Sequence, residues 1–175
     1  LLPVLLHLRR GALAGLGGHR HRTAWQVAGL AGSLPILPEV RIAEGIPLLR
    51  APREGEDIVA DYAHTGLTLR RHPIAVLRDQ LSARGFVDSA LLRSLANGSN
   101  VRTAGLVITR QRPGSAEGVT FVTLEDEHGS INLIVWRDVA ERQRQALIGS
   151  RLLGLAGKLQ REGEVMHVIA HRLVD

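Results

Sequence analysis

Few residues of this chain could support catalysis, and a run of three acids is the most conspicuous group. Glu125, Asp126 and Glu127 are consecutive, and enzymes that join or hydrolyse polymers use clustered carboxylates to hold divalent metal ions. Consecutive residues of a strand point to opposite faces, however, and this run leads into a turn at His128 and Gly129. The run is therefore a poor two-metal site, and we interpret it as a solvated turn with a capping role.

Other reactive groups give no stronger signal for catalysis. His19 and His21 lie two residues apart beside arginines, and His167 and His171 lie four apart in a β-like run. Neither pair has the H-x-x-E-H frame or a similar metal-binding frame. The chain has no cysteine and no P-loop, so thiolate metal sites and the usual phosphate cradle are excluded. We therefore expect no catalytic residue, no metal and no cofactor, and a binding function.

Basic side chains beside two predicted loops indicate contact with a phosphate backbone. Arg110 and Arg112 border the short segment 111–118, which could hold phosphates or could equally be a solvated hairpin loop. Lys158 and Arg161 follow at the end of a later β-like run and could extend the contact. These four cations are the candidate phosphate contacts.

Aromatic side chains in the same region could stack on bases. Asn132, Ile134 and Trp136 alternate with aliphatic residues. Because the Asn132 face is the more polar, we expect it to point outward, with Trp136 at the surface. An exposed Trp would contribute about 1–3 kcal/mol per stacked base, although a Trp136 that fills the core is an equally good interpretation. Phe121 is a further candidate for stacking, but the core is the favoured place for its ring.

Five β-like runs and one helix must position these side chains. The runs alternate in polarity and are rich in Val, Ile, Thr and aromatics. They lie at residues 101–110, at two places within 119–136, at 152–159 and at 165–173. A helical segment at 138–148 separates the third run from the fourth. Three strands, a helix and two strands is the element order of an OB-fold, a small Greek-key barrel that often binds oligonucleotides.

The predicted fold class is α+β, with an N-terminal helical segment followed by a five-stranded OB-fold β-barrel. Residues 1–30 are expected to end a helical region like a helix-hairpin-helix, 31–97 to form a connector with short helices, and 98–175 to form the nucleic-acid-binding domain. Three glycines inside predicted strands would permit sharp coiling of the barrel or, alternatively, mark loops. They are Gly105, Gly154 and Gly157.

Charge is spread unevenly along the chain. The net charge is +5, of which residues 1–97 carry +4 (12 basic and 8 acidic groups) and residues 98–175 carry +1 (10 and 9). A nearly neutral barrel would bind DNA through a local basic face. The longest apolar run, residues 1–8, is too short to span a bilayer, so no membrane contact is expected. Because the chain begins at Leu1 and its only methionine is Met166, we interpret it as a piece of a longer polypeptide.

Three segments carry a resemblance to a known family. They read LAGLGGHRHRTAWQVAG, DYAHTGLTLRRHPIAVLRDQL and AGLVITRQRPGSAEGVTFVTLEDEHGSINLIVW, and the last is followed by VAERQR and LLGLAGKLQREGEVMHVIAHRL. They resemble the C-terminal region of bacterial error-prone (translesion) DNA polymerases of the C family, relatives of the replicative polymerase III alpha subunit. The resemblance implies that the catalytic palm and the PHP domain lie upstream of Leu1, so this chain alone is no enzyme although its parent family is a nucleotidyltransferase. Glu117 stands where the family often has a basic residue, which weakens the expected phosphate contact of its loop.

This resemblance favours a barrel that binds single-stranded template DNA during translesion synthesis and DNA repair, in the bacterial cytoplasm at the nucleoid. The alternative is a protein-docking module that recruits a sliding clamp or accessory translesion proteins through exposed apolar strand edges. An independent hydrolase is a third interpretation, which the missing catalytic cluster disfavours.

Overall fold

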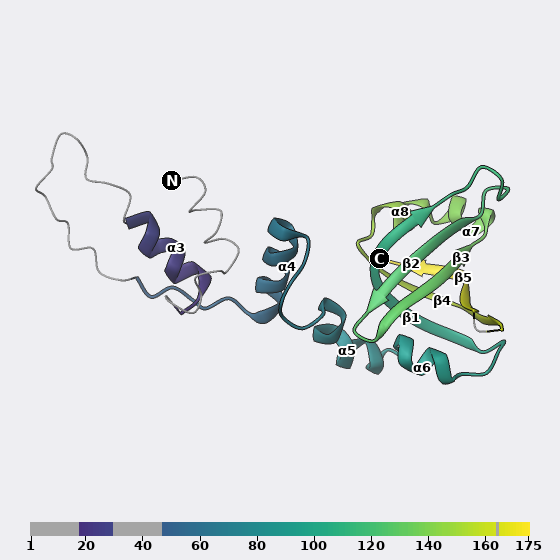
Figure 1. Cartoon of the computed structure of the whole chain (residues 1–175), viewed down its shortest axis with the longest axis horizontal. Coiled ribbons are helices and arrows are strands. Elements are labelled where there is room, and N and C mark those ends of the chain that lie inside the picture. Colours follow the sequence, from purple (N-terminus) through teal and green to yellow (C-terminus); the bar gives the residue numbers. More distant parts are fainter. Residues whose placement is uncertain (1–17, 30–46, 164) are drawn as a thin grey trace, which may run out of the picture. The chain divides into compact units, whose positions relative to one another are not determined.

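The computed structural model describes residues 18–29, 47–163 and 165–175 (Figure 1). The chain divides into two compact units, residues 1–70 and residues 71–175, which we call the N-terminal unit and the barrel unit. Among the described residues, no helix is both long and apolar enough to cross a membrane. Of the helix-hairpin-helix-like region predicted at residues 1–30, only residues 18–29 are described, and the part of the predicted connector at residues 31–46 lies outside the described residues.

The N-terminal unit contains the helices α3 (Arg20–Gly29) and α4 (Glu54–Thr65). The start of α4 is stabilised by Glu56, whose carboxylate accepts the backbone N–H of Arg53 at 2.8 Å. Acidic residues in this first turn also suit the positive end of the helix dipole. The helix ends at Gly66, a left-handed residue whose N–H donates to the carbonyl of Tyr62.

A network of ion pairs joins α3 to α4. The guanidinium of Arg20 lies 2.6 Å from a carboxylate oxygen of Asp57 and 2.7 Å from one of Asp61. Arg70 approaches the other oxygen of Asp57 at 2.8 Å. Arg20, Asp57 and Asp61 expose only 9%, 10% and 13% of their side chains, and such nearly buried charges are tolerated because they neutralise one another.

The barrel unit is built on five strands that close into a barrel in the order β1-β2-β3-β5-β4. Their bounds are β1 Asn100–Gln111, β2 Thr120–Asp126, β3 Gly129–Val135, β4 Leu152–Glu162 and β5 Val165–Val174. β3 and β5 pair in parallel and all other pairs are antiparallel. The predicted class, helices followed by a five-stranded OB-fold barrel, is confirmed.

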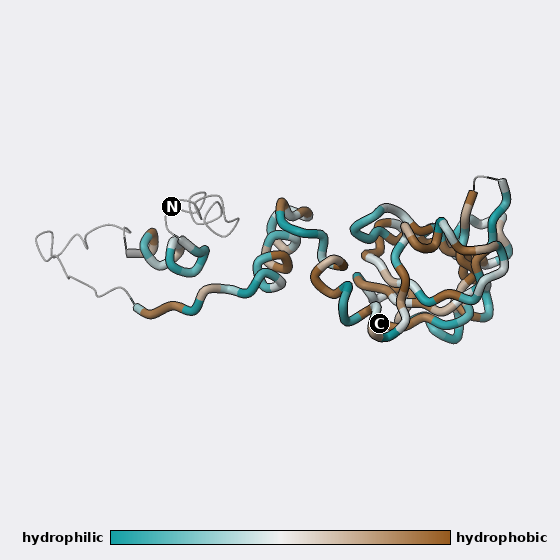
Figure 2. The backbone as a smooth tube through the Cα atoms, turned by 90° about the horizontal axis from the view of Figure 1, so that it is seen from below, coloured by the Kyte–Doolittle hydropathy of each residue, from teal (hydrophilic) through white to brown (hydrophobic). Residues whose placement is uncertain are grey.

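The core of the barrel comes from one side of each strand. Along β2 and β3, every second residue is buried, and the fully enclosed side chains include Leu124, Ile131 and Leu133. In Figure 2, stretches of apolar residues, coloured brown, border the interior of the barrel. Burial of side chains of this kind contributes about 1.5–3 kcal/mol each, so the strand alternation that the sequence shows is what fixes the two faces.

Two glycines allow neighbouring strands to approach closely. A Cβ on Gly105 in β1 would lie 2.8 Å from the carbonyl oxygen of Glu125 in β2. A Cβ on Gly157 in β4 would collide with the carbonyl oxygen of Ile169 in β5, next to the register shift between Ala156 and Gly157. Both lie inside strands, as does Gly154, so the alternative that they mark loops is wrong.

Four short helices accompany the strands. They are α5 (Pro73–Ala83), α6 (Ser89–Ser94), α7 (Arg137–Arg142) and α8 (Arg144–Gly149). The helix predicted at 138–148 is thus two helices, broken at Gln143. The break has a clear use, because the side-chain oxygen of Gln143 accepts the backbone N–H of Leu173 in β5 at 2.7 Å.

The helices α5 and α6 contact the barrel directly. α5 lies against β1 and β2, and α6 lies against β3. Ile74 of α5 and Leu92 of α6 are fully buried. The part of the predicted connector from Arg71 onward therefore falls in the same compact unit as the strands.

Candidate nucleic-acid interface

The outer face of β2 and β3 carries two exposed aromatic rings. Thr120, Val122 and Leu124 point into the barrel, so Phe121 between them must point outward, and 39% of it is exposed. Trp136, which directly follows β3, is 51% exposed. The expected exposure of Trp136 is confirmed, whereas the preferred placement of Phe121 in the core is wrong, because strand alternation assigns the interior to its neighbours.

Polar side chains lie beside the aromatic rings on the same face. Asn132 is exposed, as predicted, and pairs across the ladder with Thr123. The Thr123 hydroxyl donates to the side-chain oxygen of Asn132 at 3.3 Å. This contact leaves the amide nitrogen of Asn132 directed away from Thr123, where it can donate to a ligand.

The loop between β1 and β2 brings two arginines together beside this face. Gly118 has φ +90, which favours glycine. A Cβ there would lie 3.0 Å from the stem of Arg137 and 3.3 Å from the guanidinium of Arg112. Arg137 also pairs with Glu141 at 2.8 Å. A shallow hollow next to the loop is lined by Trp136, Arg137, Asp138 and Glu141.

Arg137 is a candidate that sequence reasoning missed. It directly follows Trp136 in the chain, and that adjacency was the available signal. Its position beside Arg112 depends on the fold of the loop, which no local pattern reveals. Both side chains are exposed and can reach a phosphate backbone, although the guanidinium of Arg137 must share its charge with Glu141.

Two of the predicted phosphate contacts are engaged elsewhere. The guanidinium of Arg110 donates to the carbonyl of Leu147 at 2.5 Å and to the carbonyl of Ser150, at the end of α8. Arg161 donates through its guanidinium to the carbonyl of Arg93 at 2.7 Å, at the end of α6. Free helix carbonyls need such partners, so both arginines serve the ends of helices.

Lys158 remains available, but on another strand. It is exposed on β4 and pairs across the ladder with Asn100 on one side and Ile169 on the other. Of the seven residues predicted for the site, the structure thus places four on or beside the outer face of β2 and β3, leaves Lys158 exposed on β4, and turns Arg110 and Arg161 toward backbone carbonyls. The four are Arg112, Phe121, Asn132 and Trp136.

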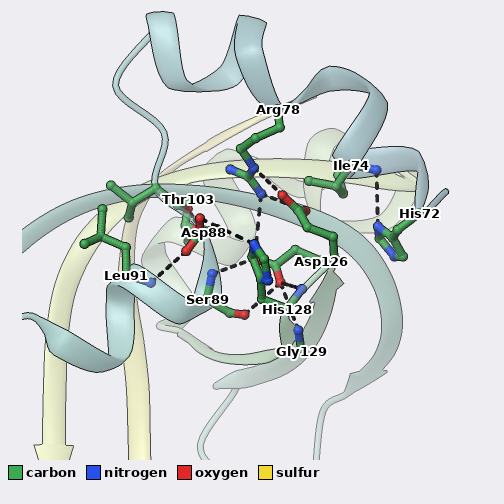
Figure 3. Close-up of polar contacts among 12 residues, drawn as sticks. His72, Ile74, Arg78, Asp88, Ser89, Leu91, Thr103, Asp126, His128 and Gly129 are labelled. Carbon is green, nitrogen blue, oxygen red and sulfur yellow. Dashed lines mark hydrogen bonds and ion pairs between the residues drawn. The ribbon is translucent and has the colours of Figure 1, made fainter.

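The acidic run is an anchor for α6, and its interpretation as a solvated turn is wrong for Asp126, which is 3% exposed. The carboxylate of Asp126 accepts the hydroxyl of Ser89 at 2.7 Å and its N–H at 2.6 Å, and the N–H groups of His128 and Gly129 at 2.8 and 3.0 Å (Figure 3). The expected capping role is present in the turn itself, at His128 and Gly129, and it extends to a helix 37 residues away. The distant partner leaves no local sequence signal.

Charge and hydrogen bonding control the protonation of this anchor. Burial by itself raises the pKa of Asp126, but the bonds from Ser89 and His128 and the charge of Arg78 outweigh it, so the pKa lies below its usual value. Burial likewise raises the pKa of Glu127, and the two hydrogen bonds from Arg78 at 2.5 and 2.9 Å bring it below the usual value. Both groups are therefore anionic at neutral pH.

No metal site accompanies these carboxylates within the part of the chain that the structure describes. There, no group of three or more His, Cys, Asp or Glu side chains is placed to hold an ion. The carboxylate oxygens of Asp126 accept hydrogen bonds from four N–H and O–H donors, as expected of a structural carboxylate.

The barrel and its outer face define a class of protein. Residues 101–175 match the family described as OB-fold nucleic acid binding domain. The exposed aromatics and the cations of the face are the groups that domains of this class use on single strands.

Comparison with whole proteins narrows the class. The chain is 55% identical over 174 residues to the error-prone DNA polymerase of Alkalilimnicola ehrlichii, and the matched region is 99% of this chain and 17% of that protein. It is 52% identical over 164 residues to the error-prone DNA polymerase of Methylococcus capsulatus, and the matched region is 94% of this chain and 16% of that protein. The chain thus spans about a sixth of the length of these relatives. The predicted resemblance to the C-terminal region of error-prone DNA polymerases is confirmed.

A solved structure is also similar to part of this chain. The asparaginyl-tRNA synthetase from Pyrococcus horikoshii has 24% sequence identity and a TM-score of 0.38, over 45% of this chain and 20% of that one. This likeness carries no argument about function.

Proposed function

We propose that this chain is the part of an error-prone DNA polymerase that binds single-stranded template DNA during translesion synthesis and DNA repair. The observation that carries the proposal is the exposure of Trp136 and Phe121 on the outer face of an OB-fold, beside Arg112. The chain contributes binding, and the nucleotidyl transfer belongs to other parts of the polymerase. The site of action is the bacterial cytoplasm, at the nucleoid.

Binding combines stacking with a modest electrostatic grip. Each stacked base contributes about 1–3 kcal/mol. Arg112, Arg137 and Lys158 can neutralise about three phosphates, so log K should fall with log salt at a slope of roughly −2 for a single strand. The barrel region carries a net charge of only +1, which limits the affinity for any polyanion that lacks exposed bases.

The test is fluorescence anisotropy of a labelled single-stranded oligonucleotide, titrated with the chain at low and at moderate salt. The replacement Trp136→Ala should weaken binding by about 5- to 150-fold, which corresponds to the loss of one stacked base. Trp25→Ala is the matched control, because Trp25 is 44% exposed in the N-terminal unit. Equal affinity for the two variants, or no saturable binding at low salt, would contradict the proposal.

Protein docking is a second candidate function, and one observation favours it. Val59, Leu67 and Leu69 of the N-terminal unit are 70%, 56% and 97% exposed. Exposed apolar residues of this kind often mark a contact with another protein, here a sliding clamp or an accessory translesion protein. An interaction that persists at high salt and is lost in Leu69→Asp, with no binding of DNA, would favour docking over template binding.

A further inference from the structure

The candidate face continues beyond β2 and β3 onto the other side of the barrel. Phe121 pairs with Ile134, Ile134 with Ile169 of β5, and Ile169 with Lys158 of β4. We call Phe121, Ile134 and Ile169 the apolar row. Residues paired across a ladder share one face, so the row crosses three adjacent strands without interruption, and Ile134 and Ile169 are both partly exposed.

A polar row runs parallel to the apolar row. Thr123 pairs with Asn132, Asn132 with His167 of β5, and His167 with Gln160 of β4. All four side chains are at least partly exposed. A ligand that stacks on the apolar row would therefore meet hydrogen-bonding groups along its whole length on this side.

Cations lie at both ends of the apolar row. Arg112 follows Gln111, the residue of β1 that pairs with Phe121. Lys158 pairs with Ile169 at the opposite end. A surface with an apolar centre and a cation at each end is complementary to a short single strand, whose bases are apolar on their faces and whose phosphates are anionic.

Acidic residues border the polar row on its other side. Glu125, two residues beyond Thr123 in β2, and Glu162, two beyond Gln160 in β4, are both exposed. The nearby Arg93 and Arg161 donate to backbone carbonyls, of His128 and of Arg93 respectively. Glu125 and Glu162 offset the charges of Arg93 and Arg161, so this side should attract a nucleic-acid backbone less than the ends that carry Arg112 and Lys158.

We infer that a single strand crosses the barrel along the apolar row from Arg112 to Lys158, that Ile169 and His167 of β5 are contact residues, and that Glu125 and Glu162 set the limit of the site. The inference rests on the proposed binding of single-stranded DNA. The path from β2 to β4 covers three strand spacings of about 4.8 Å, or roughly 14 Å. That length suits the shorter OB-fold sites of about four nucleotides.

The first test measures whether β5 belongs to the site, by anisotropy of the full chain with a labelled thymidine oligonucleotide. Ile169→Glu should weaken binding by about tenfold or more, and Ile169→Thr, which keeps a β-branched side chain, by about fivefold. Ile148→Glu is the matched control, because Ile148 is 58% exposed on α8, outside both rows. Thermal unfolding of each variant shows whether it is folded.

The second test concerns the acidic limit. Glu125→Gln with Glu162→Gln should tighten binding by about fourfold at low salt, since removal of one charge at about 10 Å from a phosphate in water is worth roughly twofold. Asp79→Asn with Asp175→Asn changes the net charge equally at exposed residues away from the rows and should have little effect.

The outcomes separate this inference from the proposed function. If Trp136→Ala weakens binding but both Ile169 variants bind like the wild type, the path across β5 is wrong and template binding stands. If the double glutamine variant binds no more tightly than its control, the acidic limit is wrong. If the wild type shows no saturable binding at low salt, the proposed function and the inference fail together.

Discussion

At the scale of residues, hydrogen bonding separates the arginines that can bind from those that hold the fold. All four are exposed, but Arg112 and Arg137 lie near Trp136, whereas Arg110 and Arg161 donate to carbonyls at helix ends. A guanidinium engaged by carbonyls contributes about 1.5–3 kcal/mol to stability per charged hydrogen bond. The four arginines look equivalent in the sequence, and only their distant partners distinguish them.

The available cations should dominate the electrostatic part of binding. Arg112→Glu combined with Lys158→Glu is expected to abolish binding of a single-stranded oligonucleotide, because two attractive charges become repulsive. Anisotropy at low salt measures this. The matched control is Arg144→Glu with Arg151→Glu, which changes the same charge at two exposed residues away from the apolar row. Equal affinities of the two double variants would remove Arg112 and Lys158 from the site.

At the scale of elements, the anchor at Asp126 and Glu127 holds α5 and α6 on the barrel. Arg78 of α5 donates to the carboxylate of Glu127. Ser89 of α6 donates to the carboxylate of Asp126 (Figure 3). The acidic turn between β2 and β3 therefore organises two helices that precede the strands in the chain. The acidic cluster therefore has a structural role, whereas its composition alone suggests either a catalytic site or a solvated turn.

Acid should weaken this anchor. The pKa values of Asp126 and Glu127 are lowered in the folded protein, so the unfolded chain binds more protons as the pH approaches the ordinary values of about 3.9 and 4.3. Their contribution to stability is complete above about pH 5 and is lost as the pH falls through the lowered pKa values.

Urea unfolding between pH 7 and pH 3 measures the effect. Glu127→Gln should be less stable than the wild type at pH 7 by about 1–3 kcal/mol and should lose less stability on acidification. Glu125→Gln, at the exposed neighbouring position, should keep the full pH dependence. The same pH dependence in all three proteins would show that the anchor does not titrate as described.

The sequence predicts the elements better than it predicts their contacts. The five strands and the outward Asn132 face are confirmed, because alternation is local. The burial of Asp126 and the diversion of Arg110 were not predicted, because each depends on groups 37 to 40 residues away. Phe121 was misplaced because size and apolarity favoured the core, while alternation decided the face.

At the scale of the whole molecule, the barrel unit should be stable without the N-terminal unit but not without α5 and α6. A fragment of residues 71–175 should keep the urea midpoint of the barrel in the full chain. A fragment of residues 98–175 loses Ile74, Phe86 and Leu92, which are buried, and leaves Asp126 without Ser89. We expect it to be less stable by more than about 3 kcal/mol, or unfolded.

Circular dichroism during urea titration compares the two fragments. The shorter fragment serves as the test of the boundary at residue 98 and the longer one as the test of the boundary at residue 71. Equal stability of both fragments would show that α5 and α6 do not stabilise the barrel.

The closure of the barrel also limits the rate at which the chain folds. β1 and β4 are joined in the ladder although Asn100 and Lys158 are 58 positions apart, and β3 must find β5 across two intervening helices and a strand. Loops of that length form late, and barrels dominated by such pairings fold in milliseconds to seconds. Until the ring is complete, strand edges stay open to other copies of the chain. Refolding at high protein concentration should therefore favour aggregates, and slow dilution should favour the native barrel.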